Sequence, residues 1–186
     1  MAPKVRITRE MIVDAALALI RETGYPSLNA RAIADRLNCS TQPVLYQFKT
    51  MEEIREAVYA AADDLHTKYI MARIETAENP FLSIGLAYIR FGYEEPNLFR
   101  FLFQTDRFAG MDLLSIMDDP EMEPLLSLAR RELECSPEEI REKFIVFVIA
   151  VHGYASLLAN NTLEYDEVQA GRILEAVYDG MKGKNR

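Results

Sequence analysis

The chain has 186 residues, of which 49% are hydrophobic and 27% are charged. A chain of this length and composition can bury a core, which excludes an intrinsically disordered protein. The net charge of −8 is uneven: residues 1–50 carry seven basic and four acidic side chains, whereas residues 51–186 carry 14 basic and 25 acidic ones. The asymmetry suggests a basic module, suited to a polyanion, on an acidic body, although a local excess of +3 also fits ordinary scatter.

Helical periodicity runs along the whole sequence, and no segment alternates in the way that a strand does. The apolar spacing predicts a first helix at 9–23 and a short second helix at 30–37, which begins after Asn29. A third helix of about seven residues begins after the expected capping residue Ser40. Pro43 lies in its first turn, where a backbone N–H has no partner inside a helix, so this proline is compatible with a helix start.

The third helix is too short to be stable alone and must pack on the other two. We expect Val44, Leu45 and Phe48 to form its inner side, and its polar residues to point elsewhere: Thr41, Gln42, Tyr46 and Gln47. Two short helices joined by a tight turn form a helix-turn-helix. The polar side of the second one offers hydrogen-bond donors and acceptors suited to DNA base edges.

Beyond residue 50, prolines divide the chain into further helices. A long helix is predicted at 51–76, with Thr50 as its cap, and others are predicted at 80–94, 97–104, 108–118, 121–134, 137–161 and 166–182. The predicted fold class is therefore all-α. An N-terminal three-helix domain with a helix-turn-helix, residues 1–50, continues into a larger helical domain, residues 51–186.

Three features of the sequence bear on compartment. The start, MAPKVRITRE, has no apolar segment of the kind that signal peptides contain. Cys39 and Cys135 are far apart and lack metal-binding spacing, as is typical of reduced thiols in a cytoplasm. The uncharged stretch at 144–163 approaches the length of a membrane span, but it contains His152 and Gly153. We expect a cytoplasmic protein without a membrane partner, in which this stretch is a buried helix.

The sequence TREMIVDAALALIRETGYPSLNARAIADRLNCSTQPVLYQFKTMEEI, about residues 8–55, resembles the N-terminal DNA-binding domain of TetR-family transcriptional regulators. The matching residues, which include Ala15, Gly24 and Ile33, are in register without a gap. Two further segments, AYIRFGYEEPNLFRFLF at 87–103 and HGYASLL at 152–158, resemble the C-terminal regulatory domain of one TetR subgroup. That subgroup often has an aromatic run around a P-x-L-F-R segment.

Helix spacing and the resemblance together suggest a set of DNA-binding residues: Arg31, Ser40, Thr41, Gln42, Tyr46, Gln47 and Lys49. The two glutamines suit base edges, whereas Arg31, Tyr46 and Lys49 suit the phosphate backbone. Leu45 stands where the family most often has tyrosine. Whether Tyr46 and Lys49 replace the family's usual phosphate contacts stays open, and a merely solvated polar face is the alternative for the whole set.

The resemblance also implies a mostly apolar cavity for a small-molecule effector in the C-terminal helices. Our ligand-binding candidates are Tyr88, Arg90, Phe91, Phe103 and His152, although a plain core role is the default for such residues. The sequence does not identify the effector. We expect no cofactor and no metal, because the two histidines, His66 and His152, lack the spacing of a zinc site.

The last two helices, near 137–161 and 166–182, resemble a dimerisation unit, although they could simply cover the core. We therefore predict a ligand-responsive DNA-binding transcriptional regulator, with repression favoured, that binds a palindromic operator as a homodimer. The alternative is a helical small-molecule-binding or scaffolding protein whose helix-turn-helix is only structural. No hydrolase, nucleotide-binding or metalloprotease motif is present, so an enzyme is not expected. Operator, regulated genes and the sign of regulation are not determined by the sequence.

Overall fold

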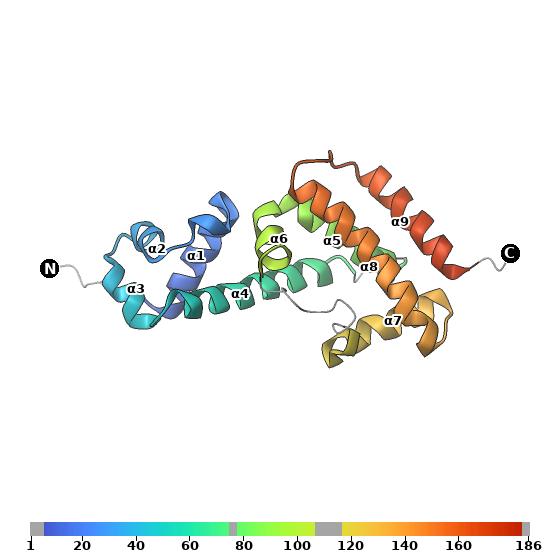
Figure 1. Cartoon of the computed structure of the whole chain (residues 1–186), viewed down its shortest axis with the longest axis horizontal. Coiled ribbons are helices and arrows are strands. Elements are labelled where there is room, and N and C mark those ends of the chain that lie inside the picture. Colours follow the sequence, from blue (N-terminus) through green and yellow to red (C-terminus); the bar gives the residue numbers. More distant parts are fainter. Residues whose placement is uncertain (1–5, 75–77, 107–116, 184–186) are drawn as a thin grey trace. The chain divides into compact units, whose positions relative to one another are not determined.

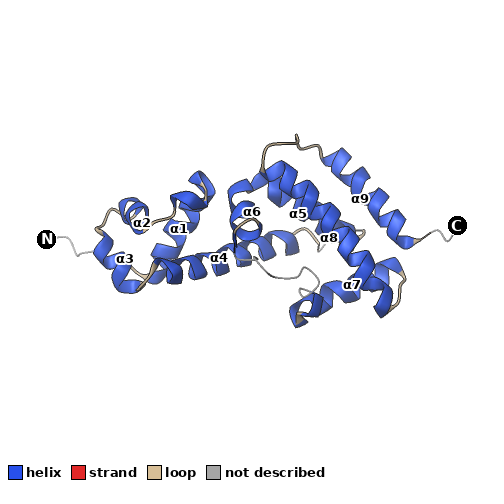
Figure 2. Ribbon diagram, in the orientation of Figure 1, coloured by secondary structure: helices blue, strands red, loops and turns tan. Residues whose placement is uncertain are grey.

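The computed structural model describes residues 6–74, 78–106 and 117–183, and every regular element in these ranges is a helix (Figure 2). The prediction of an all-α fold is confirmed. The predicted helix at 108–118 lies almost entirely outside the described residues.

The chain divides into two compact units, which we describe separately. The first unit combines the chain up to Thr67 with Asn97–Thr105, and the second combines Lys68–Pro96 with the chain from Asp106 onward. The long helix α4 (Met51–Met71) therefore belongs to both units: its residues up to Thr67 are part of the first unit, and its residues from Lys68 are part of the second. A functional boundary at residue 50 remains a prediction.

Three short helices form the beginning of the first unit (Figure 1): α1 (Arg9–Thr23), α2 (Ala30–Arg36) and α3 (Thr41–Gln47). Their bounds agree with the predicted ones within one residue. The Thr8 hydroxyl caps α1 by accepting from the Met11 amide. The side-chain Oδ1 of Asn29 caps α2 by accepting from the Ala32 amide at 2.9 Å. Ser40 occupies the N-cap position of α3, but its side chain makes no capping hydrogen bond, contrary to our expectation.

Apolar side chains of these helices and of the start of α4 are buried in the first unit, among them Ile12, Ala16, Ile20, Ile33, Ala34, Val44, Phe48, Ile54 and Val58. Val44 and Phe48 are four residues apart and share a face of α3. Leu45 lies about 100° further round the helix and is 46% exposed. The prediction that Leu45 packs inward with them is therefore wrong.

Helix α4 begins as predicted, since the Thr50 hydroxyl accepts from the Glu53 amide at 3.1 Å. It ends at Met71, earlier than predicted; residues 72–74 form a turn, and the last predicted positions lie outside the described residues. Helix α6 (Pro96–Phe103) also belongs, apart from its first residue, to the first unit. There the side-chain Nδ2 of Asn97 donates to the Arg21 backbone carbonyl at 2.8 Å, and this bond ties α6 to the end of α1.

The second unit contains α5 (Pro80–Glu94), α7 (Glu123–Leu133), α8 (Pro137–Ala159) and α9 (Glu167–Lys182), with a 3₁₀ turn at Pro120–Met122. Helix α8 starts with a capping box, in which the Ser136 hydroxyl accepts from the Glu139 amide and the Glu139 carboxylate accepts from the Ser136 amide. The helix begins at Pro137, as predicted.

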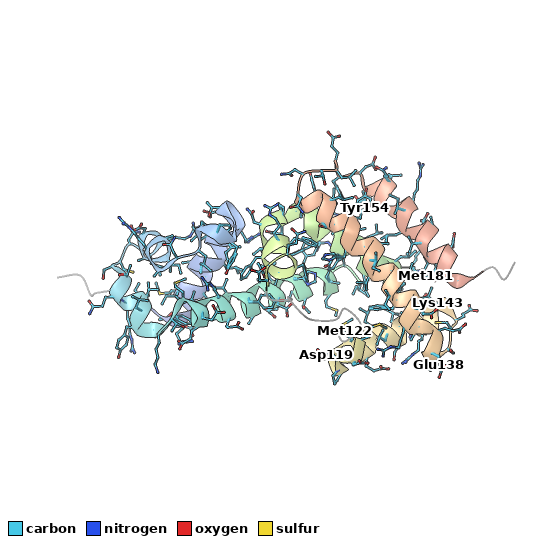
Figure 3. All side chains as sticks on the ribbon, in the orientation of Figure 1. Asp119, Met122, Glu138, Lys143, Tyr154 and Met181 are labelled. Atoms are coloured by element: carbon cyan, nitrogen blue, oxygen red, sulfur yellow. The ribbon has the colours of Figure 1, made fainter. Side chains whose placement is uncertain are left out.

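Helix α5 packs against α8 and α9 around an aromatic core (Figure 1). The rings of Phe81 and Phe147 lie 4.2 Å apart, and Tyr154 of α8 and Met181 of α9, labelled in Figure 3, are buried in the same core. Within the described residues, α8 alone is long and apolar enough to span a membrane, a test that core helices of soluble proteins also pass. One side of α8 is buried as predicted, whereas its opposite side is exposed.

Candidate nucleic-acid interface

A tight turn holds α3 against α2. Asn38 adopts the left-handed conformation, with φ of 51°, which asparagine tolerates better than most residues. The Cys39 amide then donates to the Ala34 carbonyl at 3.0 Å and closes the turn. The turn fixes the direction in which α3 leaves α2, and Val44 and Phe48 fix which side of α3 faces inward.

The outward side of α3 and its surroundings carry most of the predicted DNA-binding residues. Six of the seven are exposed: Arg31, Ser40, Thr41, Gln42, Tyr46 and Lys49. Tyr46 is strongly exposed, since 84% of its surface is accessible. Thr41 and Gln42 open the helix, and Tyr46 lies one turn beyond Gln42, so these three side chains present a continuous polar face.

Gln47 has a different environment from the other six. It is half-buried, and its side-chain Nε2 donates to the Ile7 carbonyl at 2.8 Å. Its own backbone carbonyl accepts from Arg9 Nη1 at 2.5 Å. The structure thus ties Gln47 to the chain before α1.

Leu45 is an exposed residue that our sequence reasoning placed in the core. It lies one turn after Thr41 and adds apolar surface next to the polar face of α3. Such a side chain suits the methyl group of a thymine. The resemblance described above contained a signal, because Leu45 stands where the family that the sequence resembles most often has tyrosine.

The charges around this face are partly tied to one another. Arg36 of α2 donates two hydrogen bonds to Glu22 of α1, at 2.6 and 2.7 Å, and these bonds lower the pKa of Glu22. Beside the end of α3, a shallow surface depression of about 320 Å³ is lined by Arg6, Thr8, Arg9, Glu10 and Gln47. Two arginines and one glutamate therefore line the surface beside Gln47, at the C-terminal end of α3.

The ligand-binding candidates of the second unit lie in three environments. The Tyr88 hydroxyl and His152 Nδ1 are 3.0 Å apart and hydrogen-bonded, and burial lowers the pKa of His152. Arg90 donates to Glu94 at 2.6 Å and lies 3.8 Å from Glu167, so it joins α5 to the start of α9. Phe91 is fully buried in the core.

Phe103 is the exception among these candidates, because it belongs to the first unit. Its ring meets that of His66 at a steep angle, with centroids 5.2 Å apart. Of the five candidates, the structure brings Tyr88 and His152 into direct contact. In the part of the chain that the structure describes, no group of three His, Cys, Asp or Glu side chains is arranged to hold a metal ion.

Comparison with protein families gives two matches that together cover most of the chain. Residues 12–58 match the model described as bacterial regulatory proteins of the tetR family. Residues 81–181 match the model of the tetracyclin repressor-like C-terminal domain. The first match contains α2, α3 and their turn, and the second contains most of the second unit. No curated protein sequence matches the chain.

Solved structures share this fold at low sequence identity. A TetR-like transcriptional regulator from Rhodococcus sp. RHA1 is 18% identical, with a TM-score of 0.68 over 95% of this chain and 97% of that one. A proposed transcriptional regulator from Pseudomonas aeruginosa PAO1 is 16% identical, with a TM-score of 0.69 over 94% and 89%. The multidrug binding protein EbrR, complexed with imidazole, is also 16% identical, with a TM-score of 0.54 over 91% and 88%. At these identities the likeness shows a common fold.

Proposed function

Because the chain belongs to the TetR family of DNA-binding transcriptional regulators, we propose that it is a ligand-responsive repressor that binds a palindromic operator as a homodimer. The observation that carries this proposal is the outward orientation of Thr41, Gln42 and Tyr46 on a helix whose other side is buried. A helix-turn-helix places such a helix in the major groove. The protein would act in the cytoplasm, where the operator is.

In this proposal α3 reads the operator through different kinds of contact. Gln42 hydrogen-bonds a base edge, with adenine as the natural partner of an amide, and Leu45 contacts a thymine methyl group. Arg31, Tyr46 and Lys49 contact phosphates and set the register of the head on the duplex. Exposure of all five side chains is what these roles require.

The proposal of a homodimer rests on an exposed apolar side of α8. Val146, Ile149, Gly153 and Leu157 are exposed, and they follow one another at intervals of three, four and four residues on the side opposite the buried core residues. An exposed apolar stripe of this period fits the pairing of helices. On α9 the exposed Ile173 adds to the apolar surface. We propose that α8 and α9 pair with their copies in a four-helix arrangement.

The effector site is proposed around the hydrogen-bonded pair Tyr88 and His152, with Arg90 and Phe91 on the same helix as Tyr88. Two covalent connections carry a change in this region toward the DNA-binding helices. One is α4, and the other is Glu95, which links α5 to α6, where Asn97 bonds to α1. An effector that binds one state more tightly by about 1–3 kcal/mol changes operator affinity about 5–150-fold.

The alternative is a helical small-molecule-binding protein whose helix-turn-helix only packs. The net charge of −8 favours it, and the EbrR likeness is compatible with it. An enzymatic role has less support, since the TetR family is a family of regulators. Measured affinity for a defined DNA sequence distinguishes a DNA-binding regulator from this small-molecule-binding alternative.

The test is selection of genomic DNA fragments by the immobilised protein, followed by sequencing. We expect enrichment of one inverted repeat, with half-sites about one helical turn apart or a multiple of it. Native mass spectrometry of the purified protein tests the effector site, and a co-purifying small molecule lost in Tyr88→Ala would support it. If no sequence is enriched over fragments recovered with Gln42→Ala, the packing-only alternative is preferred.

A further inference from the structure

We propose that Arg9 and Gln47 form a clamp that positions α3 for DNA binding, and that neither side chain contacts the DNA itself. The inference rests on the proposed function, because it assigns a positioning role at the same interface. We call the four residues Ile7, Arg9, Gln47 and Phe48 the α3 clamp.

The clamp joins two parts of the chain that are about forty positions apart. Arg9 Nη1 donates to the Gln47 carbonyl at 2.5 Å, and Gln47 Nε2 donates to the Ile7 carbonyl at 2.8 Å. The Arg9 guanidinium also lies over the Phe48 ring, with its carbon 3.8 Å from the ring centroid. Two hydrogen bonds and a cation–π contact thus hold the end of α3 to the beginning of α1.

Helix α3 depends on such outside support. It has seven residues, and isolated helices of this length do not form in water. Within α3 only Val44 is fully buried, and Ser40 makes no capping hydrogen bond at the other end. The turn from α2 fixes the N-terminal end of α3, whereas the α3 clamp, which includes the buried Phe48, fixes its C-terminal end.

The location of Arg9 is unfavourable for its own helix, because a cation in the first turn opposes the helix dipole. At the C-terminal end of α3 the same guanidinium is favourable, since it lies at the negative end of that dipole and donates to a terminal carbonyl. Arg9 therefore stabilises α3 more directly than α1, although it belongs to α1 in the sequence.

Positioning and base reading are exclusive roles for Gln47. An amide that recognises adenine in the usual bidentate way uses its oxygen and its nitrogen together on one base. In this structure the nitrogen is directed at the Ile7 carbonyl of the same chain. Our earlier assignment of Gln47 to the base edges would require that bond to break, whereas Gln42 is exposed.

The first test uses the full-length protein without DNA. Arg9→Met keeps the apolar contact with Phe48 and removes the charge and the donors, and Gln47→Met removes the amide at similar size. Amide hydrogen exchange in α3 is expected to be at least threefold faster in both variants at a temperature where each is folded. The control is Arg31→Met, which removes an exposed cation from α2 and should leave exchange in α3 unchanged. Equal exchange in wild type and both variants would overturn the clamp.

The second test measures binding to the selected operator and to unrelated DNA. Arg9→Met and Gln47→Met should each bind the operator about three- to tenfold more weakly than the wild type, as expected for loss of one or two such contacts. The variant that carries both substitutions should lose little more affinity than either single variant. The salt slope of binding and the preference at each operator position should not change. A slope reduced by about one in Arg9→Met, or a preference relaxed at one base pair in Gln47→Met, would mean direct contact with DNA and would overturn the proposal. If the wild type binds no DNA, the proposed function fails, while hydrogen exchange still decides on the clamp.

Discussion

Gly92 of α5 lies directly against the backbone of Ala155 on α8. A β-carbon at position 92 would stand 2.8 Å from the Ala155 carbonyl oxygen and 3.0 Å from its β-carbon. Because the neighbour is helix backbone, it cannot rotate away as a flexible side chain does. This close approach of α5 to the backbone of α8 therefore requires a residue without a side chain at position 92.

Gly92→Ala is expected to lower the free energy of unfolding by about 1–3 kcal/mol, since overpacking at a rigid contact separates the two helices. The measurement is urea unfolding followed by circular dichroism. The matched control is Gly171→Ala on α9, where an added β-carbon meets nothing within 4 Å. There the better helix propensity of alanine should raise stability by about 0.5–1 kcal/mol. Equal effects of the two substitutions would contradict the packing argument.

If the protein forms the dimer proposed above, Ile149→Glu is expected to convert it into monomers. Ile149 is 59% exposed in the centre of the α8 stripe, and a carboxylate there would be buried without a partner if two copies paired. Sedimentation velocity at micromolar concentration gives the oligomeric state. Met71→Glu on α4 is the control, because Met71 is 57% exposed but lies on neither α8 nor α9. A dimer that survives Ile149→Glu, or one that Met71→Glu also dissociates, would place the interface elsewhere.

His66 should make the protein less stable in mild acid. Burial lowers its pKa from 6.5 to about 4, so the folded state disfavours the charged ring. The unfolded chain takes up this proton as the pH falls through 6.5, and stability present above that pH is then lost progressively toward pH 4. Between pH 7.5 and 5.5 the loss from His66 is about 1 kcal/mol.

His66→Gln isolates this contribution, because other groups titrate equally in both proteins. The fall in the free energy of unfolding between pH 7.5 and 5.5 should be smaller in the variant by about that amount, measured by urea unfolding at each pH. Burial lowers the pKa of His152 as well, which acts in the same direction and remains in the variant. An identical fall in wild type and variant would mean that His66 is accessible to protons in the folded state.

Much of the helical framework could be predicted from local signals. Capping residues such as Thr8, Asn29 and Ser136 mark helix starts through hydrogen bonds within three residues, and such signals are visible in a sequence. The membership of α6 in the first unit was not predicted. It involves contacts between residues far apart in the sequence, such as the bond between Asn97 and Arg21 across 76 positions and the ring contact between Phe101 and Tyr25. Helical periodicity does not predict such pairs.

In the candidate DNA-binding site, too, local sequence signals predicted some side-chain environments and missed others. The outward orientation of Thr41 and Gln42 follows from helical spacing, because Val44 and Phe48 fix the inner side. The prediction failed for Leu45, since hydrophobicity alone does not tell a core residue from an exposed one at the border of a narrow apolar face. The environment of Gln47 depends on Ile7 and Arg9, which only the folded chain brings close.

The most direct test of the central claim is the affinity of wild type and Gln42→Ala for the selected operator at two salt concentrations. If α3 reads DNA from the major groove, wild-type affinity falls steeply as salt rises, because phosphate contacts release counterions. Gln42→Ala should then bind the operator weaker by about 1–3 kcal/mol with the same salt slope and with relaxed preference at one base pair. Affinity that is insensitive to salt, or a Gln42→Ala variant indistinguishable from wild type, would contradict the account.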